Sequence, residues 1–159
     1  MSLKVMHEQK LAELLKKKCI NLNLTSTTKK DIILELADLI AKSGKFKDKK
    51  VIAKALLLRE KLGSTGIGNG VAIPHVKLAD VKKFLLIFGR IPQGVDFGAL
   101  DAEKTYLFFV LVSPQNEVGG HLKIMAKVSH LVKDKFVIER LKKAEDEDEV
   151  MEIIHANEK

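Results

Sequence analysis

Glycines and a histidine gather in residues 62–75, where their types and spacing could bind phosphate. Four of the ten glycines fall within eight residues there: Gly63, Gly66, Gly68 and Gly70. Because glycine has no Cβ and adopts positive φ, the N–H groups of such a loop can converge on an anion. His75 follows Pro74, which fixes its own φ and keeps the preceding residue extended. The pattern therefore predicts a short buried strand over 71–73 that delivers a rigidly held imidazole to a phosphate-binding loop.

Two better-known glycine motifs do not fit this stretch. A P-loop needs a lysine and a hydroxyl after its last glycine, but Gly68 is followed by Asn69-Gly70. A dinucleotide fingerprint follows a strand and opens a helix, whereas here a helical pattern precedes the glycines and Pro74-His75 follows them. On the residues alone, a simple turn with an ordinary, partly buried His75 stays open beside the phosphate site.

Residues 59–75 also resemble a known signature, and their sequence is REKLGSTGIGNGVAIPH. It is similar to the active-site signature of IIA domains of the phosphoenolpyruvate-dependent sugar phosphotransferase system, in the fructose/mannitol class that includes the nitrogen-regulatory IIA proteins. The resemblance extends from about Leu14 to the C-terminus. It implies one domain over residues 1–159, with residues 1–3 a possible cloning remnant.

The resemblance assigns the central chemical role to His75. In that family, the histidine that ends the Ile-Pro-His motif accepts a phosphoryl group from the phosphocarrier HPr and passes it to a IIB component. The chemistry is reasonable, because a neutral imidazole nitrogen can attack phosphorus without first losing a proton. The mechanism requires no metal and no cofactor.

Four further residues are assigned to the site by the resemblance. His121, in the motif Gly-Gly-His-Leu, matches the second family histidine and is expected to donate a hydrogen bond to the phosphoryl oxygens. Its place near the start of a helix also favours an anion. Arg59 matches the family arginine, whose guanidinium can bind phosphate through paired bonds. Ser64 and Thr65 are predicted to be supporting hydroxyl donors.

Two functions stay open at this point. In the first, the chain is a transferase component of a sugar uptake system, with HPr or an HPr-like protein as donor and a IIB component as acceptor. In the second, it is a regulatory protein of the nitrogen-type branch, phosphorylated by the same chemistry, whose protein partners depend on its phosphorylation state. The absence of a fused IIB, IIC or HPr-like segment in the 159 residues favours the regulatory branch modestly.

The composition predicts a single globular domain in the cytoplasm. The chain has 159 residues, of which 46% are hydrophobic and 31% charged. No apolar run approaches the ~20 residues of a membrane span, and no signal peptide is evident, so we expect no direct membrane insertion. Cys19, the one cysteine, cannot form an internal disulfide, which is compatible with a reducing compartment. One cysteine among scattered histidines also predicts no zinc site.

The net charge of +7 raises the alternative of a nucleic-acid-binding module. The lysines, however, form short separate clusters, and aromatic residues make up only 5% of the chain. Stacking platforms for single-stranded nucleic acid are therefore not evident. We expect solvated lysine-rich faces and no nucleic-acid partner.

Hydrophobic periodicity predicts an α/β sandwich with a mixed β-sheet flanked by helices on both sides, as the resemblance also implies. Helices are expected over about 4–18, 28–43, 48–61, 121–133, 137–143 and 148–155. Strands are expected over 19–24, 71–73, 84–88 and 106–112, with a connector over 76–80 and turns over 90–98. The expected core faces of two helices are Val51, Ile52, Ala55, Leu56 and Leu58 in one, and Leu122, Met125, Val128 and Val132 in the other. The remaining histidines, His7, His130 and His155, are interpreted as ordinary imidazoles.

Overall fold

The computed structural model describes residues 9–44, 46 and 48–158. The helices are α1 (Leu11–Leu14), α2 (Lys29–Lys42), α3 (Lys49–Lys61), α4 (Val118–Leu131), α5 (Lys135–Lys143) and α6 (Glu147–Asn157). The strands are β1 (Leu15–Asn21), β2 (Gly66–Gly68), β3 (Val71–Ala72), β4 (His75–Leu78), β5 (Leu85–Val95) and β6 (Thr105–Pro114).

A mixed six-stranded sheet forms the middle layer. Its strand order is β1-β5-β6-β3-β2, and β4 also pairs with β6. Strand β6 runs antiparallel to β5 and parallel to both β3 and β4. This central position explains why the segment 105–114 is the most apolar in the chain, since its residues are buried on both faces of the sheet.

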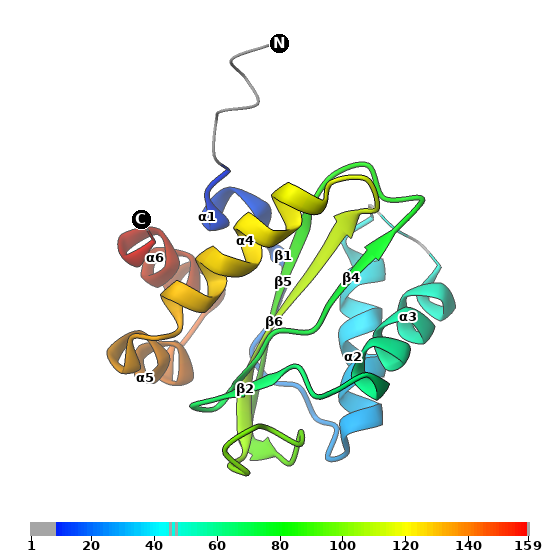
Figure 1. Cartoon of the computed structure of the whole chain (residues 1–159). Helices are drawn as coiled ribbons and strands as arrows, with labels where there is room; N and C mark the ends of the chain where they lie inside the picture. The colour runs from blue at the N-terminus through cyan, green and yellow to red at the C-terminus, as the bar shows by residue number, and fades with distance from the viewer. Residues whose placement is uncertain (1–8, 45, 47, 159) are drawn as a thin grey trace.

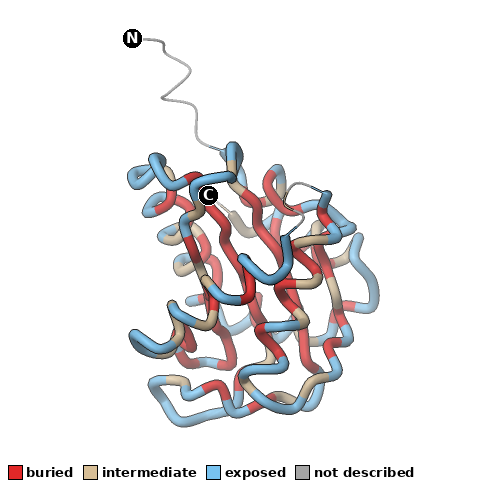
Figure 2. The backbone as a smooth tube through the Cα atoms, turned by 90° about the vertical axis from the view of Figure 1, so that its right-hand side faces the viewer, coloured by how far each residue is buried: buried red, intermediate tan, exposed pale blue. Residues whose placement is uncertain are grey.

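Helices cover both faces of this sheet, which confirms the predicted fold class. Helices α2 and α3 pack together on one face, against β1, β5 and β4 (Figure 1). Helices α1, α4, α5 and α6 lie on the other face. Figure 2 shows the buried backbone running through the interior between exposed outer stretches. None of the helices in the described ranges is both long enough and apolar enough to cross a bilayer.

Helices α2 and α3 begin at side-chain caps, within one residue of the starts expected from the sequence. The Thr28 side chain accepts a hydrogen bond from the Asp31 N–H at the start of α2, and Asp48 caps α3 in the same way. The two C-terminal helices, strands β3 and β6 and the first half of β5 also lie where the sequence predicted them.

The N-terminal prediction was wrong where it can be compared. Residues 1–8 lie outside the described residues. Only Leu11–Leu14 is helical, and strand β1 begins at Leu15, four residues before the expected start. The apolar pattern of Leu11, Leu14 and Leu15 is compatible with a helix or with a strand. Pairing of β1 with β5 makes the chain extended from Leu15 onward.

Two loop predictions were also wrong. The expected connector over 76–80 contains most of β4, which pairs parallel to β6 from His75 opposite Leu111. The expected turns over 90–98 include the second half of β5, which continues to Val95 despite Pro92 and Gly94. Val95 pairs with Thr105 after an irregularity in the ladder, so the turn residues mark a distorted strand.

The buried faces of α3 and α4 differ from the prediction. In α3, Val51 and Leu58 are exposed, while Ala53 is buried. In α4 the buried residues are His121, Ile124, Val128 and Leu131, and Leu122 is 63% exposed. The face of α4 therefore includes a histidine that hydrophobic periodicity leaves out.

A buried arginine links the sheet to the C-terminal helices. Arg90 lies on β5, and its guanidinium donates to the carbonyl oxygens of Leu22, Leu141, Lys142 and Ala144 at 2.8–3.1 Å. Three of these oxygens lie at the C-terminal end of α5, where most carbonyls lack helical partners. Burial lowers the pKa of Arg90.

Candidate functional site

The glycine-rich stretch is a β-hairpin rather than an open loop. Strands β2 and β3 pair antiparallel, and Asn69 and Gly70 connect them with φ of 59° and 82°. Positive φ at both central residues is the requirement of a tight type I′ turn, for which Asn-Gly is the preferred pair. The Asn69-Gly70 pair was therefore a signal for this hairpin that the sequence analysis did not use.

His75 is the first residue of β4, directly beyond this hairpin. Its Nδ1 lies 2.8 Å from the carbonyl oxygen of Ile73. A carbonyl can only accept, so Nδ1 carries a proton and donates it. In a neutral ring Nε2 is then the unprotonated nitrogen, with its lone pair available.

Arg59 reaches that nitrogen from the last turn of α3. Its Nε donates to His75 Nε2 at 3.3 Å, and its Nη1 donates to the Gly63 carbonyl at 3.0 Å. The guanidinium has five N–H donors, so it keeps others for a ligand. The Arg59 guanidinium is thus hydrogen-bonded to the imidazole nitrogen that carries the lone pair.

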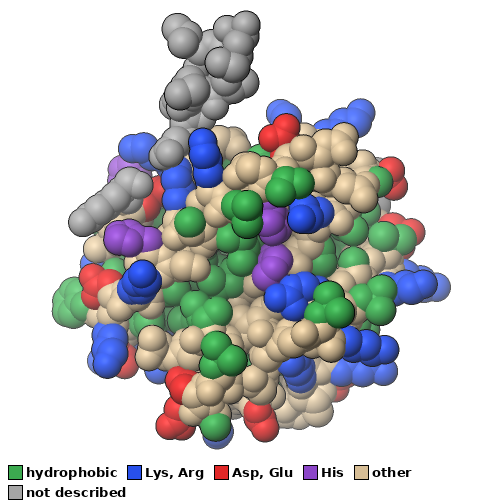
Figure 3. Space-filling model, in the orientation of Figure 1, with side chains coloured by type: hydrophobic (Ala, Val, Ile, Leu, Met, Phe, Trp, Pro, Cys, Tyr) green, Lys and Arg blue, Asp and Glu red, His purple; other side chains and the backbone are tan. Residues whose placement is uncertain are grey.

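His121 approaches the same imidazole from α4. The two ring centroids are 5.4 Å apart, with the planes inclined at 54°. His121 is only 5% exposed, and its Nδ1 lies 2.6 Å from Ser113 Oγ at the end of β6. Figure 3 shows two histidine side chains side by side on one face, next to a cationic side chain.

Their surroundings favour the neutral form of both imidazoles. Burial, reinforced by the Arg59 charge, lowers the pKa of His75, although the Ile73 carbonyl opposes this shift. Burial, together with the nearby His75 and Lys77, lowers the pKa of His121 to about 4. His75 is therefore in the state that can attack, and His121 has one N–H to donate.

The two predicted hydroxyl donors brace the hairpin in this structure. Ser64 Oγ donates to the Phe97 carbonyl at 2.8 Å and accepts from the Gly66 N–H. Thr65 is buried, and its hydroxyl donates to the Glu60 carboxylate. His75, His121 and Arg59 are thus brought together, whereas the hydroxyls of Ser64 and Thr65 contact other groups.

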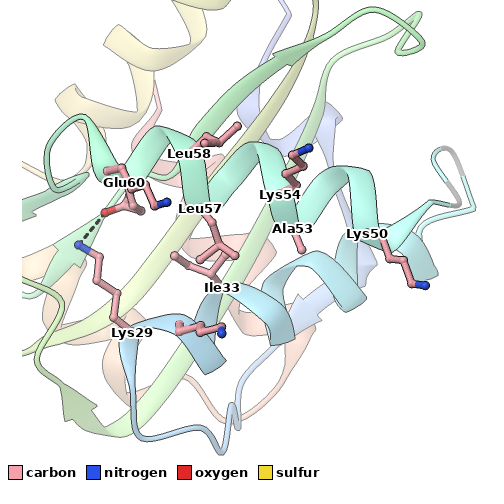
Figure 4. A pocket seen from close by; sticks show the side chains of 10 residues that line it. Lys29, Ile33, Lys50, Ala53, Lys54, Leu57, Leu58 and Glu60 are labelled. Carbon is pink, nitrogen blue, oxygen red and sulfur yellow. Dashed lines mark ion pairs between the residues drawn. The ribbon is translucent and has the colours of Figure 1, made fainter.

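Glu60 is a site-supporting residue that the sequence analysis missed. Its carboxylate accepts from both the N–H and the hydroxyl of Thr65, and pairs with Lys29 of α2 at 2.9 Å (Figure 4). Its side chain is only 5% exposed. Glu60 therefore anchors the start of the hairpin to helices α2 and α3.

A separate groove of about 840 Å³ lies between α2 and α3 and shares Lys29 and Glu60 with this anchor (Figure 4). Its floor is apolar, and lysines line its edges. Neither His75 nor His121 lines it. This groove is therefore separate from the histidine pair.

The surroundings of the histidines are apolar and exposed. Leu58 and Leu62 flank the turn of α3 that carries Arg59, and they are 52% and 85% exposed. Val118 and Leu122 flank the α4 histidine and are 50% and 63% exposed. Exposed apolar side chains around a polar centre are typical of a surface that another protein covers.

Across the described part of the chain, no three His, Cys, Asp or Glu side chains are grouped closely enough to hold a metal ion.

This arrangement of fold and site defines a class of protein. Residues 13–157 match the family described as phosphoenolpyruvate-dependent sugar phosphotransferase system, EIIA 2. The chain therefore belongs to this family, and the resemblance seen in residues 59–75 is confirmed.

Relatives of two kinds are similar to the chain. The PTS system fructose-specific EIIABC component of Bacillus subtilis is 37% identical over 150 residues, which are 94% of this chain and 24% of that protein. The crystal structure of nitrogen regulatory protein IIA-Ntr from Neisseria meningitidis is 33% identical, with a TM-score of 0.86 over 91% of this chain and 98% of that one.

A third relative is seen with a partner. Enzyme IIA-Mtl of Escherichia coli, in complex with phosphorylated enzyme IIB-Mtl, is 28% identical, with a TM-score of 0.76. The similarity covers 90% of this chain and 99% of that one.

Proposed function

We propose that the chain is a phosphoryl carrier that accepts a phosphoryl group on His75 Nε2 and passes it to a IIB component. The observation that carries this proposal is the state of His75: its Nδ1 donates to the Ile73 carbonyl, so Nε2 is the unprotonated nitrogen, and its lone pair accepts a hydrogen bond from the Arg59 guanidinium. Membership of the EIIA 2 family supports the same chemistry.

The transfer needs no proton to leave His75 first. The Nε2 lone pair forms the new N–P bond, in line with the breaking bond between phosphorus and the donor atom, whose electron pair returns to the donor. The Nδ1 proton stays on the ring, hydrogen-bonded to Ile73. Reversal of this step onto a IIB component would regenerate the starting imidazole.

Arg59 has to change partner during the reaction. In the free protein it donates to the lone pair that must attack. An incoming phosphoryl group offers several anionic oxygens, to which paired, charge-assisted bonds are stronger than a bond to neutral nitrogen. The guanidinium then stabilises the charge on the transferring group, while His121 supplies a second donor.

The proposed partners are proteins. HPr or an HPr-like phosphocarrier is the proposed donor, and a IIB component is the proposed acceptor. The IIA-Mtl relative is seen in complex with a phosphorylated IIB, which supports the second assignment. The exposed leucines and valine around the site suit brief docking of such partners. A cytoplasmic location remains a prediction.

A second candidate is a regulatory role, in which the phosphorylation state of His75 selects the bound protein without onward transfer to a sugar. Its support is the similarity to nitrogen regulatory IIA-Ntr, at a TM-score of 0.86. Both candidates need phosphorylation of the same histidine. They differ in whether a IIB component removes the phosphoryl group.

Intact-mass spectrometry at alkaline pH tests the shared step. The protein is incubated with phosphoenolpyruvate, enzyme I and HPr, and then a IIB component is added. We expect one phosphoryl group on the wild type and none on His75→Ala. The control His130→Ala, which changes an exposed histidine of α4, should also gain one phosphoryl group. Phosphorylation of His75→Ala to the wild-type extent would overturn the assignment.

Addition of a IIB component separates the two candidates. Loss of the phosphoryl group to IIB supports the transport role. Retention in the presence of a IIB that other IIA proteins phosphorylate supports the regulatory role.

A further inference from the structure

A buried serine forms a hydrogen bond with the second histidine of the site. Ser113 is fully buried on β6, His121 is 5% exposed on α4, and Ser113 Oγ lies 2.6 Å from His121 Nδ1. The contact joins the central strand to the helix that carries the second histidine.

The hydrogen bond between these atoms could run in either direction. If Nδ1–H donated to Oγ, the hydroxyl hydrogen of Ser113 would need another acceptor. Among the described residues, His121 Nδ1 is the one hydrogen-bond partner of Ser113 Oγ. Leaving a buried donor unpaired costs about 1–3 kcal/mol, so donation from serine to the ring is favoured.

That direction determines which nitrogen of His121 is protonated. Nδ1 accepts, so it carries no proton, and the single proton of the neutral ring is on Nε2. Nδ1 is held by Ser113, which leaves Nε2 as the nitrogen that can bond to a group on the neighbouring His75.

We propose that Ser113 is a positioning residue that donates its hydroxyl to His121 Nδ1 and thereby fixes the Nε2–H tautomer that His121 presents to the phosphoryl group. This inference rests on the proposed phosphorylation of His75.

The two histidines then have opposite and complementary tautomers. His75 is protonated on Nδ1 by its bond to Ile73 and offers a bare Nε2. His121 is bare on Nδ1 by its bond to Ser113 and offers an Nε2–H. Without Ser113, the other tautomer of His121 would direct a lone pair at the developing negative charge. The loss of a donor and the added repulsion would both slow transfer.

Long-range ¹H–¹⁵N NMR of the imidazole nitrogens tests the tautomer directly. We expect His121 to be protonated on Nε2 in the wild type and in Ser113→Thr, which keeps a hydroxyl. In Ser113→Ala we expect a substantial population of the Nδ1–H tautomer. A wild-type His121 protonated on Nδ1 would overturn the inference, and so would an unchanged tautomer in Ser113→Ala.

Thr105→Val is the matched control. Thr105 lies on the same strand, is fully buried, and its hydroxyl has no hydrogen-bond partner among the described residues. Its substitution removes a buried hydroxyl without touching His121. The tautomer and the transfer rate should therefore both remain those of the wild type.

Single-turnover transfer from phosphorylated HPr measures the consequence. We expect Ser113→Ala to lower the maximal rate of phosphoryl acceptance roughly 10-fold, with little change in the HPr concentration that gives half of it. Ser113→Thr should recover most of the rate. A rate for Ser113→Ala equal to that of Thr105→Val would show that the tautomer does not matter for transfer.

The two proposals fail in different ways. The NMR measurement needs no phosphorylation and uses the wild type alone for its first outcome. If the wild type accepts no phosphoryl group, the proposed function fails whatever the tautomer is. If it accepts one with His121 protonated on Nδ1, only the role of Ser113 fails.

Discussion

Arg59 and Arg90 are side chains of the same type with different roles in this molecule. Arg90 is 9% exposed and donates to four backbone carbonyl oxygens from two separate segments. Arg59 is partly exposed and donates to one carbonyl and to the nitrogen of His75. The first guanidinium is satisfied by the fold, whereas the second keeps donors for an anion.

The difference lies in the partners rather than in the charge. Carbonyl oxygens cannot leave Arg90 without opening the contact between the sheet and the end of α5. In the proposed function, the His75 nitrogen exchanges its hydrogen bond to Arg59 for a bond to phosphorus. Removal of Arg90 should therefore affect stability, and removal of Arg59 should affect chemistry.

The largest effect on stability is expected for Arg90→Ala. Four carbonyl oxygens lose their donor, and some remain buried, so the free energy of unfolding should fall by about 4 kcal/mol. Urea denaturation followed by circular dichroism measures this change. Arg90→Lys keeps the charge but lacks the forked donors, and should recover only part of the loss. An Arg90→Ala protein as stable as the wild type would contradict the assignment of Arg90 to a structural role.

For Arg59→Ala we expect a loss of about 100-fold in the rate of phosphoryl acceptance, or about 3 kcal/mol of transition-state stabilisation. The free energy of unfolding should change by less than about 0.5 kcal/mol, since the side chain is at the surface. Stopped-flow transfer from phosphorylated HPr and urea denaturation measure the two quantities. A large loss of stability with a normal rate of phosphoryl acceptance would show that Arg59, like Arg90, stabilises the fold.

The stability of the protein should depend on pH through the buried His121. The pKa of His121 is about 4 in the folded protein against an ordinary 6.5, so the unfolded chain binds its proton first as the pH falls. Stability from this group is complete above pH 6.5 and falls by about 2–3 kcal/mol by pH 4.

Denaturation of the wild type and His121→Gln between pH 7 and pH 4 tests this expectation. His121→Gln should remove about one proton from the slope of stability against pH between pH 6.5 and pH 4. Equal slopes in the two proteins would show that His121 titrates normally.

The smallest effect concerns two buried hydroxyls on β6. Ser113 has a partner and Thr105 has none among the described residues. Thr105→Val replaces an unpaired hydroxyl with a methyl group of similar size, and should raise the free energy of unfolding by about 1 kcal/mol. Thermal and urea denaturation measure it. A destabilised Thr105→Val protein would indicate a hydrogen bond to water or to a ligand.

Short-range patterns explain the parts of the fold that were predicted well. The caps Thr28 and Asp48 act on N–H groups two or three residues away, so the starts of α2 and α3 depend on local sequence and lie close to the expected residues 28 and 48. The apolar run of β6 could only be buried, and it became the central strand. The errors in the strands fall where pairing with a distant strand decides the structure, as at Leu15 and at residues 76–78.

The sequence by itself determined the chemical inventory of this protein. The signature over 59–75 identified the family, and His75, Arg59 and His121 were selected by residue type and motif. These features are local, and they depend on which side chains are present at fixed spacings.

Only the tertiary structure decided what those side chains can do. It places the ring centroid of His121 on α4 at 5.4 Å from that of His75 on β4, and burial lowers the pKa of both rings. The hydrogen bonds to Ile73 and Ser113 then assign the ring protons to different nitrogens. The tertiary structure also gives Arg90 and Arg59 different hydrogen-bond partners, which are backbone carbonyls for Arg90 and the His75 imidazole for Arg59. Burial and hydrogen-bond direction depend on groups that are distant in the chain, so folding is the step that sets them.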